Sequence, residues 1–301
     1  MESFTQDGGI PISHIMSVDV EDYFQVEAFT GSVRVDSWDS WPSRVVANTQ
    51  RALDLLDQHN VKATFFFLGW VAHRFPALVC DAAARGHEVA CHSYWHRAIY
   101  KLSPEEFRED TRVAKDVIEQ AAGVAVKGYR APTWSITRKC LWAPRILAEA
   151  GFLYDSSVYP IRHDLYGIPG AQRMPYILDC GDNLQLREYP PATLSMGGFT
   201  LPAAGGGYLR LFPMAFTHLA FREAENNGRA VVVYFHPWEL DPKQPRVRAK
   251  FRSRFRHYTN LVRMQGRLGQ LMSRYRFQRF ADALCCDNQN ATLVNTALVV
   301  Q

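Results

Sequence analysis

Short apolar runs alternate with amphipathic stretches along most of the chain. Five runs have the length and composition of buried strands, at residues 15–20, 63–68, 87–91, 126–130 and 230–235. Residues 43–58 carry apolar side chains at helical spacing, and residues 103–121 open with Ser103-Pro104-Glu105-Glu106, which suits a helix start. This alternation predicts a parallel α/β sheet, with functional residues at the carboxyl ends of its strands.

Two histidines follow one predicted strand, and a group of acids follows another. His92 and His96 are four residues apart after the run 87–91, and Asp19-Val20-Glu21-Asp22 ends the run 15–20. Imidazole is the commonest metal ligand, and two histidines with one carboxylate form a typical zinc site that keeps a position for water. A solvated loop, or histidines satisfied within the core, would explain the pair without a metal.

Three further segments end in groups that hydrolysis could use. Arg130 lies beside the turn at Pro132, Asp155 follows Tyr154, and His236 ends the all-apolar run 230–235. Taken singly, Asp155 and Arg130 are typical of structural ion pairs, and His236 of a capping or core imidazole.

The order of these segments resembles that of the NodB-type polysaccharide deacetylases. An Asp motif, His-x-x-x-His, Arg-x-Pro, Asp-Ser and an apolar strand ending in His follow one another between residues 15 and 240. The forms Ser17-Val-Asp-Val-Glu-Asp-Tyr-Phe24 and Leu209-Arg-Leu-Phe-Pro213 resemble the branch associated with bacterial exopolysaccharide and exosortase gene clusters. The resemblance implies a distorted (β/α) barrel of about seven parallel strands that removes N-acetyl groups from amino sugars of an exopolysaccharide or its precursor.

The resemblance also implies a role for each matched residue. Asp19 would be the general base and His236 the general acid, with Arg130 lowering the pKa of Asp19 and Asp155 raising that of His236. His92 and His96 would bind a divalent metal, Zn²⁺ first among the transition metals. The carboxylate ligand would be Glu21, which shares a strand face with Asp19, or Asp22 if the strand turns after Val20.

Three residues are candidates for contact with the substrate, one through its backbone N–H and two through an aromatic ring. The family's tyrosine after Arg-x-Pro is Thr133 here, whose backbone N–H the resemblance implies as an oxyanion donor. Trp134 and Trp238 are candidates either for stacking on a sugar or for the core.

The sequence is also compatible with functions other than the deacetylation of an N-acetylated glycan. A metal amidohydrolase acting on a small amide or cyclic imide would use the same residues, and a catalytically dead glycan-binding scaffold would keep the barrel alone. A His-Glu-x-x-His protease is disfavoured because Ser93 occupies the glutamate position, and a Gly-x-Ser-x-Gly elbow is absent from the sequence.

The domain organisation follows from these patterns. We expect the barrel over residues 10–242, a basic helical extension packed on it over 243–284, and a disordered tail over 285–301. Residues 159–207 are rich in Pro and Gly, so an excursion over about 159–213 is expected to border the cleft.

Charge is concentrated near the C-terminus. The formal net charge is +4, and residues 243–279 hold twelve Lys and Arg without any Asp or Glu. Apolar residues recur there at helical spacing from Tyr258 through Val262 to Tyr275, so Arg263, Arg267 and Arg274 are expected to face outward. Such a face is either simply solvated or contacts an anionic polymer or membrane surface, and nucleic acid is not expected because no nucleic-acid motif accompanies it.

The sequence also bears on localisation. No window approaches the ~20 apolar residues of a membrane span, and no basic start precedes an apolar stretch. We therefore expect a cytoplasmic protein, with peripheral contact at the inner membrane surface left open.

Overall fold

A curled sheet with seven consecutive parallel strands forms the centre of the molecule. The computed structural model describes residues 12–287 and 293–295. The parallel strands, in spatial order, are β10 (Val232–Phe235), β1 (His14–Val20), β2 (Thr64–Phe67), β3 (Glu88–Cys91), β4 (Gly128–Tyr129), β5 (Tyr154–Asp155) and β7 (Gln185–Glu188). This arrangement confirms the predicted distorted (β/α) barrel with about seven parallel strands.

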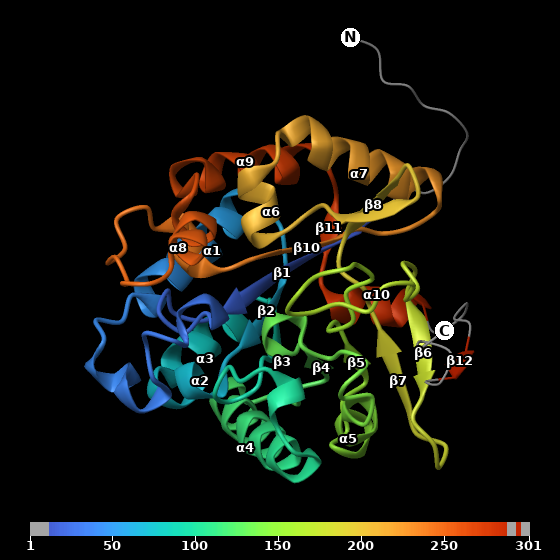
Figure 1. Cartoon of the computed structure of the whole chain (residues 1–301), viewed down its shortest axis with the longest axis horizontal. Helices are drawn as coiled ribbons and strands as arrows, with labels where there is room; N and C mark the ends of the chain where they lie inside the picture. The colour runs from blue at the N-terminus through green and yellow to red at the C-terminus, as the bar shows by residue number, and fades with distance from the viewer. Residues whose placement is uncertain (1–11, 288–292, 296–301) are drawn as a thin grey trace.

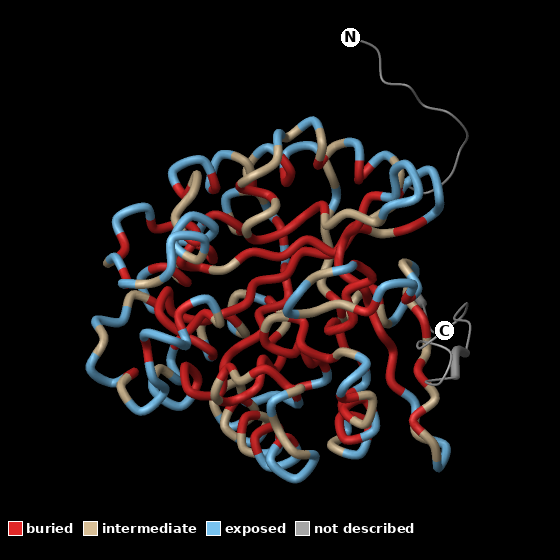
Figure 2. Tube along the Cα trace, viewed as in Figure 1, coloured by how far each residue is buried: buried red, intermediate tan, exposed pale blue. Residues whose placement is uncertain are grey.

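Helices surround the strands, whose side chains are almost wholly buried (Figures 1 and 2). They are α1 (Val45–Gln58), α2 (Gly69–Arg74), α3 (Pro76–Ala84), α4 (Pro104–Ala122), α5 (Ala143–Glu149), α6 (Gly206–Leu211), α7 (Met214–Asn226), α8 (Phe251–Tyr258), α9 (Leu261–Arg274) and α10 (Phe280–Asp287). Short 3-10 turns are η1 (Glu27–Phe29), η2 (Val35–Ser40), η3 (Ile99–Lys101), η4 (Pro132–Trp134) and η5 (Pro237–Leu240). None of the helices within the described ranges is long and apolar enough to cross a membrane.

The predicted start of α4 is a capping box. The Ser103 hydroxyl accepts the Glu106 backbone N–H at 3.2 Å, and the Glu106 carboxylate accepts the Ser103 N–H at 2.8 Å. The helix ends at Gly123, whose φ of 69° is left-handed.

The excursion does more than border a cleft, because part of it belongs to the sheet. β6 (Tyr176–Asp179) pairs antiparallel with β7, and β8 (Thr193–Met196) forms a hairpin with β9 (Phe199–Pro202). After β7 the chain crosses towards β10, since the Tyr189 N–H bonds to Asp155 O at 2.8 Å and the Ala192 N–H to Val232 O at 3.3 Å. These bonds draw the two ends of the curled sheet together.

The C-terminal part departs from expectation at particular residues. Two helices, α8 and α9, replace one continuous helical face, and Val262, expected on the buried face, is 80% exposed. Arg267 does not point freely outward, because its guanidinium donates to the carbonyls of Leu209 and Phe212, the latter at 2.8 Å.

Part of the expected disordered tail belongs to regular elements. Residues 285–287 complete α10, and β12 (Leu293–Asn295) pairs parallel with β6. The rest of that tail lies outside the described residues. Upstream of α10, β11 (Phe277–Gln278) pairs with β1, so the extension is joined to the sheet.

We predict that Gly128→Ala destabilises the fold. A Cβ at this position in β4 would lie 2.0 Å from Tyr154 Cζ in the neighbouring strand. Overpacking of this kind costs about 1–3 kcal/mol of the free energy of unfolding, which urea denaturation measures. Gly31→Ala is the matched control, because nothing lies within 4 Å of its added Cβ. Equal losses in both variants would contradict the close approach of β4 and β5.

Candidate active site

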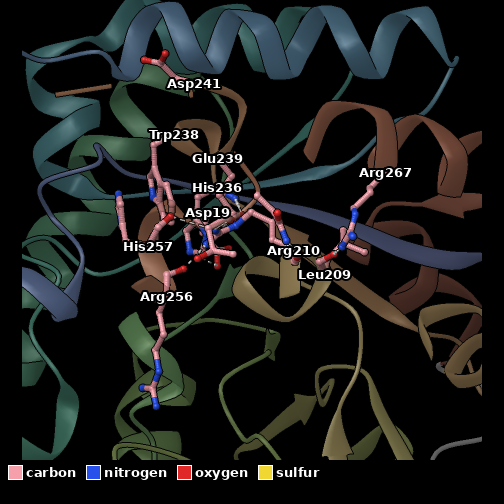
Figure 3. Close-up of polar contacts among 12 residues, drawn as sticks. Asp19, Leu209, Arg210, His236, Trp238, Glu239, Asp241, Arg256, His257 and Arg267 are labelled. Carbon is pink, nitrogen blue, oxygen red and sulfur yellow. Dashed lines mark hydrogen bonds and ion pairs between the residues drawn. The ribbon is translucent and has the colours of Figure 1, made fainter. Parts of the chain in front are cut away.

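The carboxyl ends of the strands and the loop after β3 bring six of the eight predicted site residues together at one edge of the sheet. Asp19 is the last residue but one of β1, Glu21 follows that strand, His92 follows β3, Arg130 follows β4 and His236 follows β10. His96 comes from the loop after β3. Figure 3 shows part of this edge, where Asp19 and His236 lie together. Asp19, Glu21, His92, His96 and Arg130 are at most 6% exposed.

Glu21, His92 and His96 form a cluster suited to a metal ion. One ligand atom from each lies within 4.8 Å of the other two. The His92 Nδ1 lies 2.7 Å from Arg130 O, and a carbonyl only accepts, so Nδ1 carries the proton and Nε2 keeps its lone pair. Burial lowers the pKa of His92 to about 4, which keeps the ring neutral and able to coordinate.

The contact between His96 and Glu21 requires a proton or a metal ion between the two atoms. The His96 Nε2 lies 2.7 Å from Glu21 Oε2, and both atoms are acceptors when the ring Nε2 is unprotonated. Burial would raise the pKa of Glu21, but His96, His236 and His92 outweigh it and lower the pKa to about 2. A proton on His96 or a metal cation between the two would compensate the carboxylate, so the donor set fits a divalent ion.

The loop that carries His96 is fixed by Asp110 of α4. The Asp110 Oδ2 accepts the Ser93 hydroxyl at 2.6 Å and the Tyr94 N–H at 2.8 Å. Ser93 and His96 both adopt left-handed backbone conformations, with φ of 66° and 52°. This buried carboxylate therefore holds a strained loop that aims His96 at Glu21.

Asp22, the alternative carboxylate ligand, is not placed in the cluster. Its Oδ2 accepts the Ser43 hydroxyl at 2.6 Å and the Arg44 and Val45 N–H groups at 2.9 and 3.2 Å. The carboxylate therefore caps the start of α1. Glu21 is the acid that faces the histidines because it continues the alternation of Ser17 and Asp19 along one strand face.

Arg130 holds the carboxylate of Asp19. Its Nη1 donates to Asp19 Oδ1 at 2.6 Å and to the Ser17 hydroxyl at 2.9 Å. The guanidinium is fully buried and lies over the Phe66 ring at 4.2 Å. This leaves Asp19 Oδ2 directed towards His236, whose Nε2 is 4.0 Å away.

Glu239, rather than Asp155, is the carboxylate paired with His236. Its Oε2 lies 3.2 Å from His236 Nδ1 and accepts the His236 backbone N–H at 2.9 Å. Burial disfavours the charged ring, but the hydrogen bond to Glu239 and the charges of Glu21, Glu239 and Asp19 raise the pKa of His236 to about 9. The Nε2 of His236 also lies 3.6 Å from Glu21 Oε1.

A buried arginine in turn holds Glu239 (Figure 3). The Arg210 Nε donates to Glu239 Oε1 at 2.5 Å, and both side chains are at most 1% exposed. The remaining guanidinium nitrogens of Arg210 donate to the carbonyls of Arg256, His257 and Thr259, at 3.1, 2.9 and 2.6 Å. Through Arg210, helix α6 is therefore bonded to η5 and to the end of α8, behind His236.

Asp155 supports the turn at Arg130 instead of His236, which corrects the role expected for it. Its Oδ1 accepts the Ser157 hydroxyl at 2.5 Å, and Ser157 Oγ accepts the Ala131 N–H at 2.7 Å. Burial raises the pKa of Asp155 to about 6, and burial together with Asp155 raises the pKa of Glu188 well above its usual value. A proton shared by this buried pair explains how two acids lie together in the core.

Glu239 and Arg210 are candidate site residues that sequence reasoning missed. The signal for Glu239 is its place three residues after His236 with Pro237 between them, the pattern of a capping acid that reaches back to the first residue. Arg210 carries no such signal, because its partner is 29 residues away along the chain.

The two candidate sugar-stacking tryptophans are buried. Trp134 is 6% exposed and packs on Tyr159 and Tyr234. Trp238 stacks between His236 and His257, and its Nε1 donates to Glu21 Oε1 at 3.1 Å. Trp238 therefore orients the Glu21 carboxylate of the cluster. A cavity of about 170 Å³ beside His96, lined by Phe24, Trp38 and Trp95, offers space for a substrate group.

The family comparisons match most of the described chain. The polysaccharide deacetylase model matches residues 35–152, and a domain of unknown function (DUF3473) matches residues 156–285. Residues 35–152 of the chain are thus similar to the polysaccharide deacetylases. Residues of the candidate site fall in both matched parts, with His92, His96 and Arg130 in the first and Arg210, His236 and Glu239 in the second.

Curated relatives of this family match about a third of the chain. A peptidoglycan-N-acetylglucosamine deacetylase of Bacillus cereus is 40% identical over 96 residues, which are 32% of this chain and 35% of the relative. A chitooligosaccharide deacetylase of Bradyrhizobium sp. is 32% identical over 102 residues, 34% of this chain and 44% of the relative. The chain thus spans less than half the length of either relative.

Solved structures share the fold over nearly the whole chain. A Mycobacterium smegmatis structure assigned to the polysaccharide deacetylases has a TM-score of 0.62 and 21% identity, and covers 94% of this chain and 96% of its own. An allantoinase has a TM-score of 0.59 and 16% identity, covering 92% and 90%. At these identities the likeness concerns the fold alone.

We predict that Glu239→Gln lowers the pKa of His236 in the metal-free protein. Loss of the carboxylate removes the hydrogen bond that favours the imidazolium, so the pKa should fall from about 9 towards the ordinary value near 6.5. An NMR titration of the His236 ring measures this directly. Asp155→Asn is the control and should leave the titration in place. A larger shift in the control than in Glu239→Gln would restore the role first expected for Asp155.

Proposed function

We propose that this protein is a metal-dependent N-deacetylase of amino sugars in a bacterial exopolysaccharide or its precursor. The observation that carries the proposal is that two candidate proton-transfer groups, Asp19 and His236, lie 4.0 Å apart beside a cluster that could hold a metal. Asp19 is held by Arg130, and His236 is held by Glu239, while Glu21 lies between His96 and His236. Hydrolysis of an amide needs a base for the attacking water and an acid for the leaving nitrogen, and both are here.

Each residue then has a distinct part in the reaction. A divalent ion at Glu21, His92 and His96, with Zn²⁺ the first candidate, would polarise the amide carbonyl and acidify water. Asp19 accepts the proton that water loses as its oxygen bonds to the carbonyl carbon. The C–N bond then breaks, and His236 gives its Nε2 proton to the departing nitrogen. The products are acetate and a free amino sugar.

The electrostatic surroundings support these opposite proton duties. The Arg130 guanidinium donates to Asp19 Oδ1, which leaves Oδ2 as the oxygen that would accept a proton from water. Glu239 stabilises the imidazolium of His236, which must be charged to give one. The names of the Bacillus and Bradyrhizobium relatives, both deacetylases of N-acetylated glycans, support the substrate class.

A small cyclic amide is the second candidate substrate. The fold likeness to an allantoinase favours it, because the same barrel serves that enzyme. Acetate release from a panel of N-acetylated oligosaccharides, compared with ring opening of cyclic ureides and imides, separates the two. Turnover of the cyclic compounds alone would replace the deacetylase proposal.

We predict that His92→Ala abolishes stoichiometric zinc binding and acetate release. The mutation removes one of the three proposed ligands, together with the bond of the ring to Arg130 O and its contact with the His96 ring. Zinc content after dialysis and circular dichroism measure binding and folding separately. Cys80→Ala, an exposed thiol outside the cluster, is the control and should retain both zinc and activity. Normal zinc content in His92→Ala would disprove the ligand assignment.

We predict that His236→Ala retains zinc but loses turnover. Because this ring is not in the three-residue cluster, its removal should leave the metal in place. Loss of a general acid lowers kcat by roughly 10²–10⁴-fold. The drop should be smallest for substrates with a good leaving group, such as an N-acetylated nitroaniline, since these need less protonation. An equal drop for all leaving groups would argue against proton donation.

A further inference from the structure

The segment from Lys243 to Arg256 presents a surface that the proposed chemistry does not use. Seven Lys and Arg residues fall within these fourteen positions, and all seven are exposed. None of them forms an ion pair with a carboxylate in the part of the chain that the structure describes. Phe251 and Phe255, one turn apart on α8, are 80% and 53% exposed, and their rings stack with centroids 6.3 Å apart. We call this surface the basic-aromatic face.

The basic-aromatic face is fixed to the barrel and is not a loose tail. Gln244 and Val247 alternate with the exposed cations and are at most 3% exposed. The Gln244 amide donates to Trp238 O and Asp241 O, both at 2.9 Å, and the Val247 N–H bonds to the Tyr258 hydroxyl at 2.8 Å. The segment lies at the periphery of the molecule, where most of its trace is exposed (Figures 1 and 2).

Two exposed phenyl rings lie among cations that have no carboxylate partner. A binding partner would explain this arrangement. Water is a poor environment for a phenyl ring, and seven unpaired cations repel one another. We propose that the basic-aromatic face docks on an anionic phospholipid surface, with Phe251 and Phe255 inserting at the headgroup level. This goes beyond the deacetylase proposal and does not depend on it.

The chemistry of the face favours lipid over a glycan or a nucleic acid. Residues 243–279 contain no Asp or Glu, the charged acceptors that form the stronger hydrogen bonds to sugar hydroxyls. Phenylalanine lacks the polar group with which Trp or Tyr assists recognition of a polar polymer. Anionic bilayers instead attract clusters of four to eight basic residues and accept apolar side chains beside them.

Docking of this face would also bring the active site to the membrane surface. His257 of α8 stacks on Trp238 at 4.1 Å, and Trp238 stacks on His236 at 5.0 Å. The Trp238 ring therefore lies between His257 of α8 and the ring of His236, the proposed general acid. Substrates presented at a bilayer would meet the site without the chain needing a membrane-spanning segment.

The test is sedimentation of the full chain with vesicles. One set is phosphatidylcholine alone, and in the other about a third of the lipid is phosphatidylglycerol. Binding is expected only to the anionic vesicles, and it should weaken steeply with added salt. Lys250→Gln/Arg252→Gln should weaken it roughly 30-fold, from about fivefold for each charge removed. Phe251→Ala should weaken it by roughly tenfold while leaving the salt dependence unchanged.

Matched controls make each outcome decisive. Lys127→Gln/Arg222→Gln removes the same charge from exposed positions outside the face and should bind as the parent does. All variants should release acetate from a soluble N-acetylated oligosaccharide at the parent rate, so failure of the deacetylase proposal is seen separately. No binding to anionic vesicles, or equal losses in the control, would overturn the proposal. So would tighter binding to heparin or single-stranded DNA than to vesicles with no effect of Phe251→Ala, which would mark a polyanion site.

Discussion

The burial of carboxylates at the carboxyl edge of the sheet is the constraint on which the site depends. Asp19, Glu21 and Glu239 are each at most 1% exposed, and an ionised carboxylate without a partner is costly to bury. Each has its own cation, with Arg130 for Asp19, Arg210 for Glu239 and the imidazoles for Glu21. These partners lie on different elements of the barrel. The carboxylates and their cations are therefore paired only when the barrel has folded.

This compensation also explains why the site is rigid. Removing one partner of a buried ion pair typically costs about 3–5 kcal/mol, because the other charge is left unpaired. Moving Arg130 away from Asp19 would leave a buried charge unpaired. Arg210 is held by three backbone carbonyls as well as by Glu239. In the cluster of Glu21, His92 and His96, potential acceptor atoms face one another, and a metal bound there would add positive charge beside the carboxylate.

Sequence patterns predicted the parts of the fold that depend on local chemistry. The apolar runs ending in Asp19, His92, Arg130 and His236 are strands because both faces of a parallel sheet are buried, and such runs are easily seen. The β6–β7 pair was missed because its strands are short and lie in a segment rich in Gly and Pro. Val262 was misplaced because the helical spacing was carried across the break at Thr259 and Asn260, where α8 ends and α9 begins.

The site was predicted in its residues but not in all its pairings. A carboxylate for His236 was expected from Asp155, since both stand in the family's order of motifs, yet register pairs Asp155 with Glu188 across β5 and β7. Pairing between strands in the folded protein cannot be recognised from the spacing of residues in the sequence. The capping acid Glu239 is local to His236, whereas the Arg210 side chain that holds it is 29 residues away along the chain.

The boundary between the two matched families falls inside this one active site. The first match ends at residue 152, before β7 and β10 have completed the sheet, and so before His236 is reached. A chain ending there would hold His92, His96 and Arg130 but lack His236, Glu239 and Arg210. The second match therefore does not describe an appended module, because it supplies the strands that close the curled sheet and the histidine that we propose as the proton donor.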